Sequence, residues 1–224
     1  MKILIYDKLQ DVKGVSETLL SPALSDRYNS DFIPINFNKQ EKIDCIGIGY
    51  TDATTFTITD GVKYEEITIE QPAPYQNGLY IISPQAGSAF VITHNGTFVG
   101  RVGAGEYRTL GTNPSKETGF YTTNESRQTM AGQVIPGAGG YTGRRLEADV
   151  RYKIDRNVYE DASKAYIKQI SKNFPFFIMN DDEQHKLPES ILRFYARMKD
   201  VDVLLQSSTY KFLYSFKFEF YEAF

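Results

Sequence analysis

Hydrophobic and polar positions alternate in short runs along most of the chain, and this pattern predicts strands. Residues 145–153 alternate strictly, with Leu146, Ala148 and Val150 facing one way and charged side chains the other. Near the C-terminal end, six consecutive even positions are aromatic and define one face of a strand over residues 210–220: Tyr210, Phe212, Tyr214, Phe216, Phe218 and Phe220. Shorter strands are expected at residues 1–6, 33–37, 43–50, 79–82, 174–179, 191–198 and 201–206. The chain is therefore expected to be all-β.

Two turn signals predict hairpins. Asp60-Gly61 separates the alternating runs 54–59 and 63–70, and Asn95-Gly96 separates the runs 89–94 and 97–102. The second signal is the stronger, because Asn-Gly suits the tight turn that joins two twisted strands. Residues 38–42 read as a charged turn and residues 14–32, which have no sustained period, as an ordered loop.

One segment, residues 159–172, has helical periodicity. Apolar residues from Tyr159 to Ile170 recur every three or four positions, opposite Lys164, Lys168 and Lys172. An acidic loop, residues 180–186, is expected after the next strand. The chain is thus divided into residues 1–155, a β-sandwich, and residues 156–224, a helix and strands expected to complete the same domain.

Composition and charge exclude several classes of protein. The 224 residues are 41% hydrophobic and 24% charged, with a net charge of -3 that provides no cationic surface for a nucleic acid. One cysteine and two histidines supply neither a disulfide framework nor a Cys/His zinc site. No apolar stretch approaches the roughly 18 residues of a membrane span, and the N-terminus lacks a signal-peptide core. Synthesis in the cytoplasm is the simplest interpretation.

No catalytic, metal or cofactor site is expected. His94 reads as a strand-end residue and His185 as part of the solvated acidic loop, and neither lies in a nucleophile motif. The glycine-rich runs 100–105 and 137–143 lack the strand, helix and Lys-Ser/Thr that phosphate loops need. Glu65 and Glu66 are adjacent and point to opposite faces of a strand, so they cannot act as a carboxylate pair. The protein is therefore expected not to be an enzyme.

Residues 103–143 are rich in glycine and poor in aliphatic side chains. Such a segment cannot supply a conventional core, and about forty residues is too long for an ordinary connection. We expect an extended arm within the first part of the chain. Its rings and guanidinium groups are of types enriched at protein interfaces, which makes ten residues candidate interface residues: Arg101, Tyr107, Arg108, Phe120, Tyr121, Arg127, Met130, Tyr141, Arg144 and Arg145.

The sequence also resembles a group of tailed-bacteriophage tail proteins. Residues 42–50 (KIDCIGIGY), followed by residues 53–58, resemble the N-terminal galactose-binding-like, or discoidin-like, sandwich of that group. The resemblance continues at residues 100–107, at residues 126–133 with Arg144-Arg145, and at the closing strands 175–178 and 214–223. It implies a jelly-roll, galactose-binding-like β-sandwich that carries the arm.

The resemblance implies a structural role in the virion, in the tail tip or baseplate. The partners would be copies of the same chain and other tail proteins, with no cofactor. The alternative left open is a carbohydrate-binding adhesin module that contacts a host glycan, for which four tyrosines are candidate platforms: Tyr28, Tyr50, Tyr75 and Tyr107.

Overall fold

The structure described below is a computed structural model. It describes residues 2–4, 7–12, 15–20, 26–69, 77–109, 112–122, 126–128, 134–136, 142–153, 176–179, 193–208 and 211–222, and the statements below concern these residues. The predicted helix 159–172 and the acidic loop 180–186 lie outside them. Within them the all-β prediction is confirmed, since two sheets and one separate hairpin account for nearly all of the regular structure.

The first sheet has five antiparallel strands in the order β4-β3-β5-β2-β6. Two long strands pair at its centre, β2 (Phe32–Thr51) and β5 (Asn77–His94). The others are β3 (Thr55–Thr59), β4 (Tyr64–Thr68) and β6 (Val99–Gly105). The hairpin predicted at Asp60-Gly61 is confirmed as β3–β4, and Gly61 adopts φ +87°, the left-handed conformation that glycine tolerates best.

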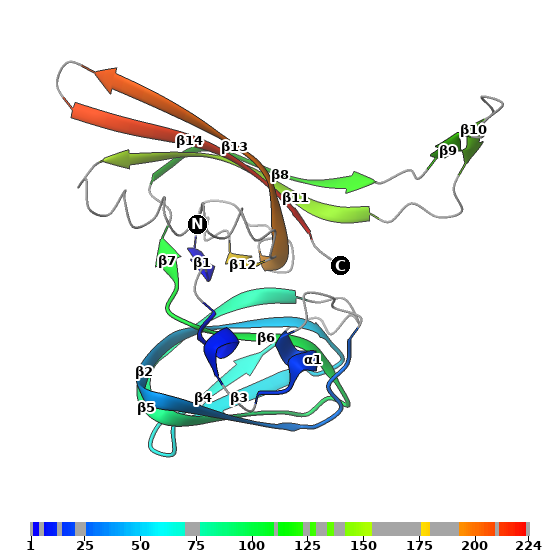
Figure 1. Cartoon of the computed structure of the whole chain (residues 1–224), viewed down its shortest axis with the longest axis vertical. Coiled ribbons are helices and arrows are strands. Elements are labelled where there is room, and N and C mark those ends of the chain that lie inside the picture. The colour runs from blue at the N-terminus through cyan, green and yellow to red at the C-terminus, as the bar shows by residue number, and fades with distance from the viewer. Residues whose placement is uncertain are drawn as a thin grey trace.

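The main core lies on the inner face of this sheet, which curls around two short helices (Figure 1). They are the 3-10 helix η1 (Lys8–Asp11), which follows the strand predicted at residues 1–6, and α1 (Glu17–Leu20), which lies within the predicted loop 14–32. Leu9 and Leu19 pack there against side chains of every strand of the sheet, including Ile46, Phe56 and Phe90, all almost fully buried. Burial of these side chains provides most of the hydrophobic stabilisation of this part of the chain.

The second sheet has seven antiparallel strands in the order β7-β1-β12-β13-β14-β11-β8. Its strands come from both parts of the chain: β1 (Lys2–Leu4), β7 (Arg108–Thr109), β8 (Thr112–Thr122), β11 (Thr142–Lys153), β12 (Phe176–Met179), β13 (Arg193–Ser208) and β14 (Lys211–Glu222). Residues 176–222 thus complete a sheet that begins at the N-terminus.

The two sheets pack face to face at β1 and β12. The ring of Phe177 on β12 lies over β2 and β6, where Gly47 and Gly103 leave room for it. A Cβ at Gly47 would lie 2.0 Å from Phe177 Cδ2. Leu4, Cys45, Leu79 and Tyr195 complete this second cluster, so β2 is buried on both faces from residue 43 to residue 49.

Several predicted turns are interruptions within continuous strands. The expected turn at residues 38–42 lies inside β2, and residues 83–88, placed between two strands, lie inside β5. The pairing of β2 with β5 shifts register between Asn36 and Glu41, so the extra residues form a bulge. In the same way, the two strands expected between residues 191 and 206 are one strand, β13, with a shift between Met198 and Val201.

The hairpin predicted at Asn95-Gly96 is wrong. Although β5 and β6 follow each other, they lie on opposite sides of β2, and β5 pairs with β3 instead. The reason is a set of side-chain bonds at the turn. Asn95 Oδ1 accepts from the N–H groups of Thr54 and Thr55, and Asp52 Oδ1 accepts from that of Thr97, so the turn is held against the loop between β2 and β3.

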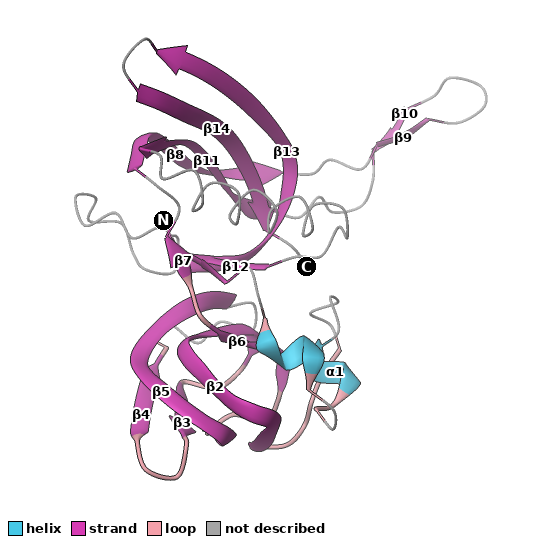
Figure 2. Cartoon of the chain, turned by 60° about the vertical axis from the view of Figure 1, so that its left-hand side comes forward, coloured by secondary structure: helices cyan, strands magenta, loops and turns pink. Residues whose placement is uncertain are grey.

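The predicted arm, residues 103–143, is not one long loop. Gly103 and Gly105 belong to β6, and β8 and β11 form a ribbon at the edge of the seven-stranded sheet. What remains separate is the hairpin of β9 (Ser126–Gln128) and β10 (Val134–Pro136), which projects from the end of that ribbon (Figures 1 and 2). Glycine content alone could not distinguish strands that accept close neighbours from a loop.

Candidate functional site

The β9–β10 hairpin is the candidate functional site, because it belongs to neither of the two sheets. Among the described strands, β9 and β10 pair only with each other, with Arg127 opposite Ile135. Two paired strands of three residues bury too little to be stable alone in water. Figures 1 and 2, which differ by a turn of 60°, both show the hairpin standing away from the two sheets.

Four of the ten candidate interface residues meet at the root of this hairpin. Phe120 and Tyr121 end β8, and in the register they lie opposite Arg144 and Gly143 at the start of β11, next to Arg145. They are therefore cross-strand neighbours, although more than twenty residues separate them in the sequence. Of the other six, Arg101 lies on β6, Tyr107 follows it, Arg108 lies on β7 and Arg127 on β9, and Met130 and Tyr141 lie outside the described residues.

The two root arginines make ion pairs within the chain. Arg144 pairs with Glu222 on β14, and its Nη1 donates to the carbonyl of Arg193 over 2.6 Å. Arg145 pairs with Glu147 and, at 3.0 Å, with Glu219. These contacts fix the root of the hairpin on the sheet.

Arg101 and Tyr107 lie at the junction of the two sheets. Arg101 is 3% exposed, and its Nη2 is 2.7 Å from Asp7 Oδ2. Burial raises the pKa of Asp7, against the opposing effects of the Arg101 charge and of the N–H groups of Ala104 and Leu9. Burial also raises the pKa of Tyr195 in the same region to about 12. Tyr107 is half-buried and donates its N–H to Asp44. Arg101 is therefore buried inside the fold and does not lie on its surface.

Of the candidate platform tyrosines, Tyr28 and Tyr50 lie near each other on the five-stranded sheet, and Tyr107 lies elsewhere. Tyr50 has φ 54°, and its ring lies 5.5 Å from that of Phe98, with the Arg27 guanidinium 4.5 Å above the Phe98 ring. Tyr28 forms a bridge to Val99 next to them. Tyr107 follows the other end of β6, and Tyr75 lies outside the described residues.

The described histidine makes structural contacts. His94 Nε2 is 2.9 Å from the carbonyl oxygen of Ser30, and its ring packs on Phe56. His185 lies outside the described residues. Among the described residues no group of three metal-binding side chains occurs, and no helix is long and apolar enough to cross a membrane.

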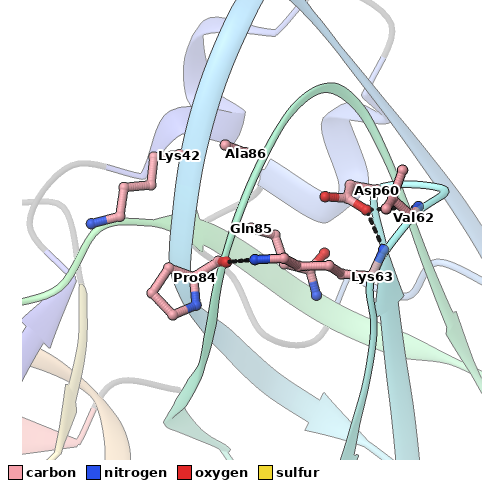
Figure 3. Close-up of a pocket in the computed structure, with 7 residues that line it drawn as sticks. All are labelled: Lys42, Asp60, Val62, Lys63, Pro84, Gln85 and Ala86. Atoms are coloured by element: carbon pink, nitrogen blue, oxygen red, sulfur yellow. Dashed lines mark hydrogen bonds between the residues drawn. The ribbon is translucent and has the colours of Figure 1, made fainter.

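A surface groove of about 330 Å³ lies where the β3–β4 turn meets β5 (Figure 3). Asp60, Val62 and Lys63 of the turn line it on one side, and Pro84 and Gln85 of β5 on the other. Gln85 is 1% exposed, and within the part of the chain that the structure describes neither polar atom of its carboxamide has a hydrogen-bond partner. Sequence reasoning missed this groove, because no pattern distinguishes a buried glutamine from one in a polar turn.

Comparisons with known proteins give only distant structural likenesses. No protein-family model and no curated protein sequence matches the chain. One similar solved structure is described as the tail of an empty GTA particle with C6 symmetry, with 12% identity, 54% of this chain and 84% of that chain covered, and a TM-score of 0.33. Another is a putative alpha-L-fucosidase from Bacteroides thetaiotaomicron, with 15% identity, 42% of this chain and 26% of that chain covered, and a TM-score of 0.29. At these scores neither assigns a function.

Proposed function

We propose that the protein is a non-enzymatic structural component of a tailed-bacteriophage virion, in the tail tip or baseplate. In this role it assembles with copies of itself and with other tail proteins. The sequence resemblance favours this class, and within it we propose that the curled sheet is the galactose-binding-like sandwich. The projecting β9–β10 hairpin is the observation that carries the assembly role.

The argument from the hairpin is energetic. Ordering a residue costs roughly 1 to 2 kcal/mol of backbone entropy, and the pairing of two three-residue strands recovers little of it. Contact with a neighbouring protein supplies the missing burial. The ribbon of β8 and β11, held by the ion pairs of Arg144 and Arg145, carries the hairpin out to that neighbour.

A deletion limited to the hairpin tests the proposal. Removing residues 106–139, the greater part of the expected arm, would also remove β7 and β8 from the seven-stranded sheet, so residues 126–136 are replaced by a short Gly-Ser turn instead. We expect the same melting temperature as the full chain, loss of self-association in light scattering, and loss of incorporation into particles in electron microscopy.

The matched control is Lys39→Ser, which changes a side chain that is 81% exposed on β2, far along the chain from the hairpin. It should assemble like the unaltered protein. Normal assembly of the hairpin deletion would show that the interface lies elsewhere. A deletion that lowers the melting temperature strongly would show that the hairpin packs on its own chain.

A further inference from the structure

We infer that the outer edge of β4 is the docking site for the β9–β10 hairpin of a second copy of this chain, with Arg127 of the hairpin opposite Glu66 of β4. The inference rests on the assembly role proposed above and names the surface that receives the hairpin. It follows from the open edge of β4, from the charges of the two elements and from their places in the fold.

β4 is an edge strand of the five-stranded sheet. Within the described part of the chain it pairs only with β3, so the backbone groups of its other edge have no strand beside them. Its Tyr64 is 64% exposed, which is unusual for a large ring. An open edge of this kind accepts an added strand through main-chain hydrogen bonds. β4 therefore offers a surface that a short hairpin can extend.

The other edge strands are less suited to this role. All residues of β6 are buried, and Tyr28 already forms a bridge to Val99 at its start. β7 has only two residues. β8 leads into the root of the hairpin itself, and Lys116 on it carries the same charge as Arg127.

The charges of β4 and of the hairpin are opposite. Glu65 and Glu66 are the charged residues of β4, and neither forms an ion pair with another described residue. The ammonium of Lys63, which precedes them, bonds instead to the carbonyl of Pro84. Arg127 is the single charged residue between positions 126 and 136. A second β4 would place carboxylates against carboxylates, whereas the hairpin supplies a cation, so the acidic edge selects the hairpin.

The two registers fit each other. Arg127 lies opposite Ile135 in the hairpin, so these two residues share a face. On β4, Tyr64 and Glu66 share a face, and the Tyr64 hydroxyl donates to Glu66 Oε2 over 3.3 Å. With Arg127 opposite Glu66, the cation lies beside both the carboxylate and the Tyr64 ring. β9 is the strand that adds, because β10 ends on Pro136, which has no N–H and is typical of an edge that stays unpaired.

The hairpin and β4 lie in different parts of the fold. Figures 1 and 2 both show the hairpin at the upper right and β4 in the lower part of the chain. The ion pairs of Arg144 and Arg145 hold the root of the hairpin on its own sheet. The hairpin that reaches β4 is therefore that of another copy. Because the two surfaces differ, the contact repeats from copy to copy and either closes into a ring or continues as a filament.

The test exchanges the two charges and measures self-association of the full chain by sedimentation velocity. Arg127→Glu and Glu66→Arg should each weaken association about tenfold or more, because each places like charges opposite one another. The variant that carries both changes should again associate with itself but not with the parent chain. The control, Lys39→Glu, makes the same change of net charge as Arg127→Glu at an exposed site on β2 and should associate like the parent.

Hydrogen exchange of β4 gives a second readout that needs no substitution in this strand. In the assembled parent, an added strand should slow the exchange of the amides of residues 64–68, compared with the chain in which a Gly-Ser turn replaces residues 126–136. This slowing distinguishes an added strand from a contact made by side chains alone.

Three results would overturn the inference. They are a doubly changed variant that does not regain association, exchange in β4 that is the same with and without the hairpin, and a parent chain that stays monomeric at every concentration. If the hairpin deletion abolishes association while Glu66→Arg does not weaken it, the hairpin binds another surface and the proposed function stands. If the deletion variant associates and enters particles like the parent, the proposed function is wrong as well.

Discussion

Arg101 Nη2 lies 2.7 Å from Asp7 Oδ2, and the two residues are 94 positions apart in the sequence. Their side chains are 4% and 8% exposed. Asp7 Oδ1 also accepts from the N–H of Leu9 and of Ala104, so this carboxylate ties η1 and the N-terminal segment to β6. The pair joins the first residues of the chain to the core of the five-stranded sheet.

Removing one partner of this ion pair should lower the stability of the fold more than replacing both partners. Asp7→Asn leaves the Arg101 charge buried without a counter-charge, and the free energy of unfolding should fall by about 3 to 5 kcal/mol. The double variant Asp7→Asn with Arg101→Met removes the stranded charge and should recover part of that loss. Urea denaturation of Asp7→Asn, Arg101→Met, the double variant and the parent completes a double-mutant cycle. Strictly additive losses would contradict the direct coupling of the two residues.

Replacing either of two glycines of the five-stranded sheet with alanine should lower the stability, for a different reason in each case. At Gly47 a Cβ would lie 2.0 Å from the buried ring of Phe177, so Gly47→Ala should cost roughly 1 to 3 kcal/mol or more through overpacking. At Gly61 nothing lies within 4 Å, and only the φ of +87° opposes a side chain. Gly61→Ala should therefore cost about 1 kcal/mol.

A second change separates the two causes. Phe177→Leu in the Gly47→Ala background should recover part of the stability by making room, and it should recover none in the Gly61→Ala background. Thermal unfolding of both pairs measures this. Equal recovery in the two backgrounds would argue against the contact of Phe177 with β2.

The turn between β5 and β6 should be sensitive to acid. Burial tends to raise the pKa of Asp52, but the Thr97 hydroxyl and the N–H groups of Phe98 and Thr97 hydrogen-bond to its carboxylate and lower the pKa overall. The native state therefore binds fewer protons than the unfolded chain near the usual range of an aspartate. The stability from Asp52 is present above that range and is lost as the pH falls through the lowered native pKa.

The measurement is the urea midpoint of parent and variants from about pH 5 down to about pH 2. Asp52→Ala should lower the midpoint at pH 5 and flatten its dependence on pH. Thr97→Val, which removes one of the donors to the carboxylate, should have an intermediate effect. Identical pH profiles for parent and Asp52→Ala would show that this carboxylate stabilises nothing.

This turn also shows what the sequence could predict. Local patterns gave the all-β class, the β3–β4 hairpin and the alternation of β11, because each depends on neighbours a few residues away. Phe220 of the aromatic face is buried as predicted, and the side chains of Phe212 to Phe218 lie outside the described residues. The Asn95-Gly96 signal was misleading because hydrogen bonds to residues more than forty positions earlier, Asp52 and Thr54, hold this turn.

The candidate site was harder to predict for the same reason. The composition of residues 103–143 predicted an extended arm, but the described part of this segment is mostly strand, because β8 pairs with β11 through contacts across some thirty residues. The burial of Arg101 depends on Asp7, and the groove at Gln85 depends on a bulge in β5. None of these long-range contacts leaves a local pattern in the sequence.

The single thiol reports on the junction of the two sheets. Cys45 is fully buried between Leu79 and Phe177, and its Sγ lies 3.4 Å from the carbonyl oxygen of Gly105. Burial, and next to it the charge of Asp44, raises the pKa of the thiol well above its usual range. Because the thiolate is the reactive form, iodoacetamide should modify Cys45 only when the sheets separate or the chain unfolds.

Weakening the junction should therefore accelerate the modification. Phe177→Ala removes the ring that covers β2 and should cost about 3 to 5 kcal/mol if separation requires global unfolding. If the seven-stranded sheet opens by itself, modification becomes faster while hydrogen exchange of the backbone amides in β2, β3 and β5 changes little. Val62→Ser, at a hairpin tip that is 93% exposed, is the control and should leave the rate unchanged. Modification of the unaltered protein as fast as that of a free cysteine would show that the two sheets do not stay packed over Cys45.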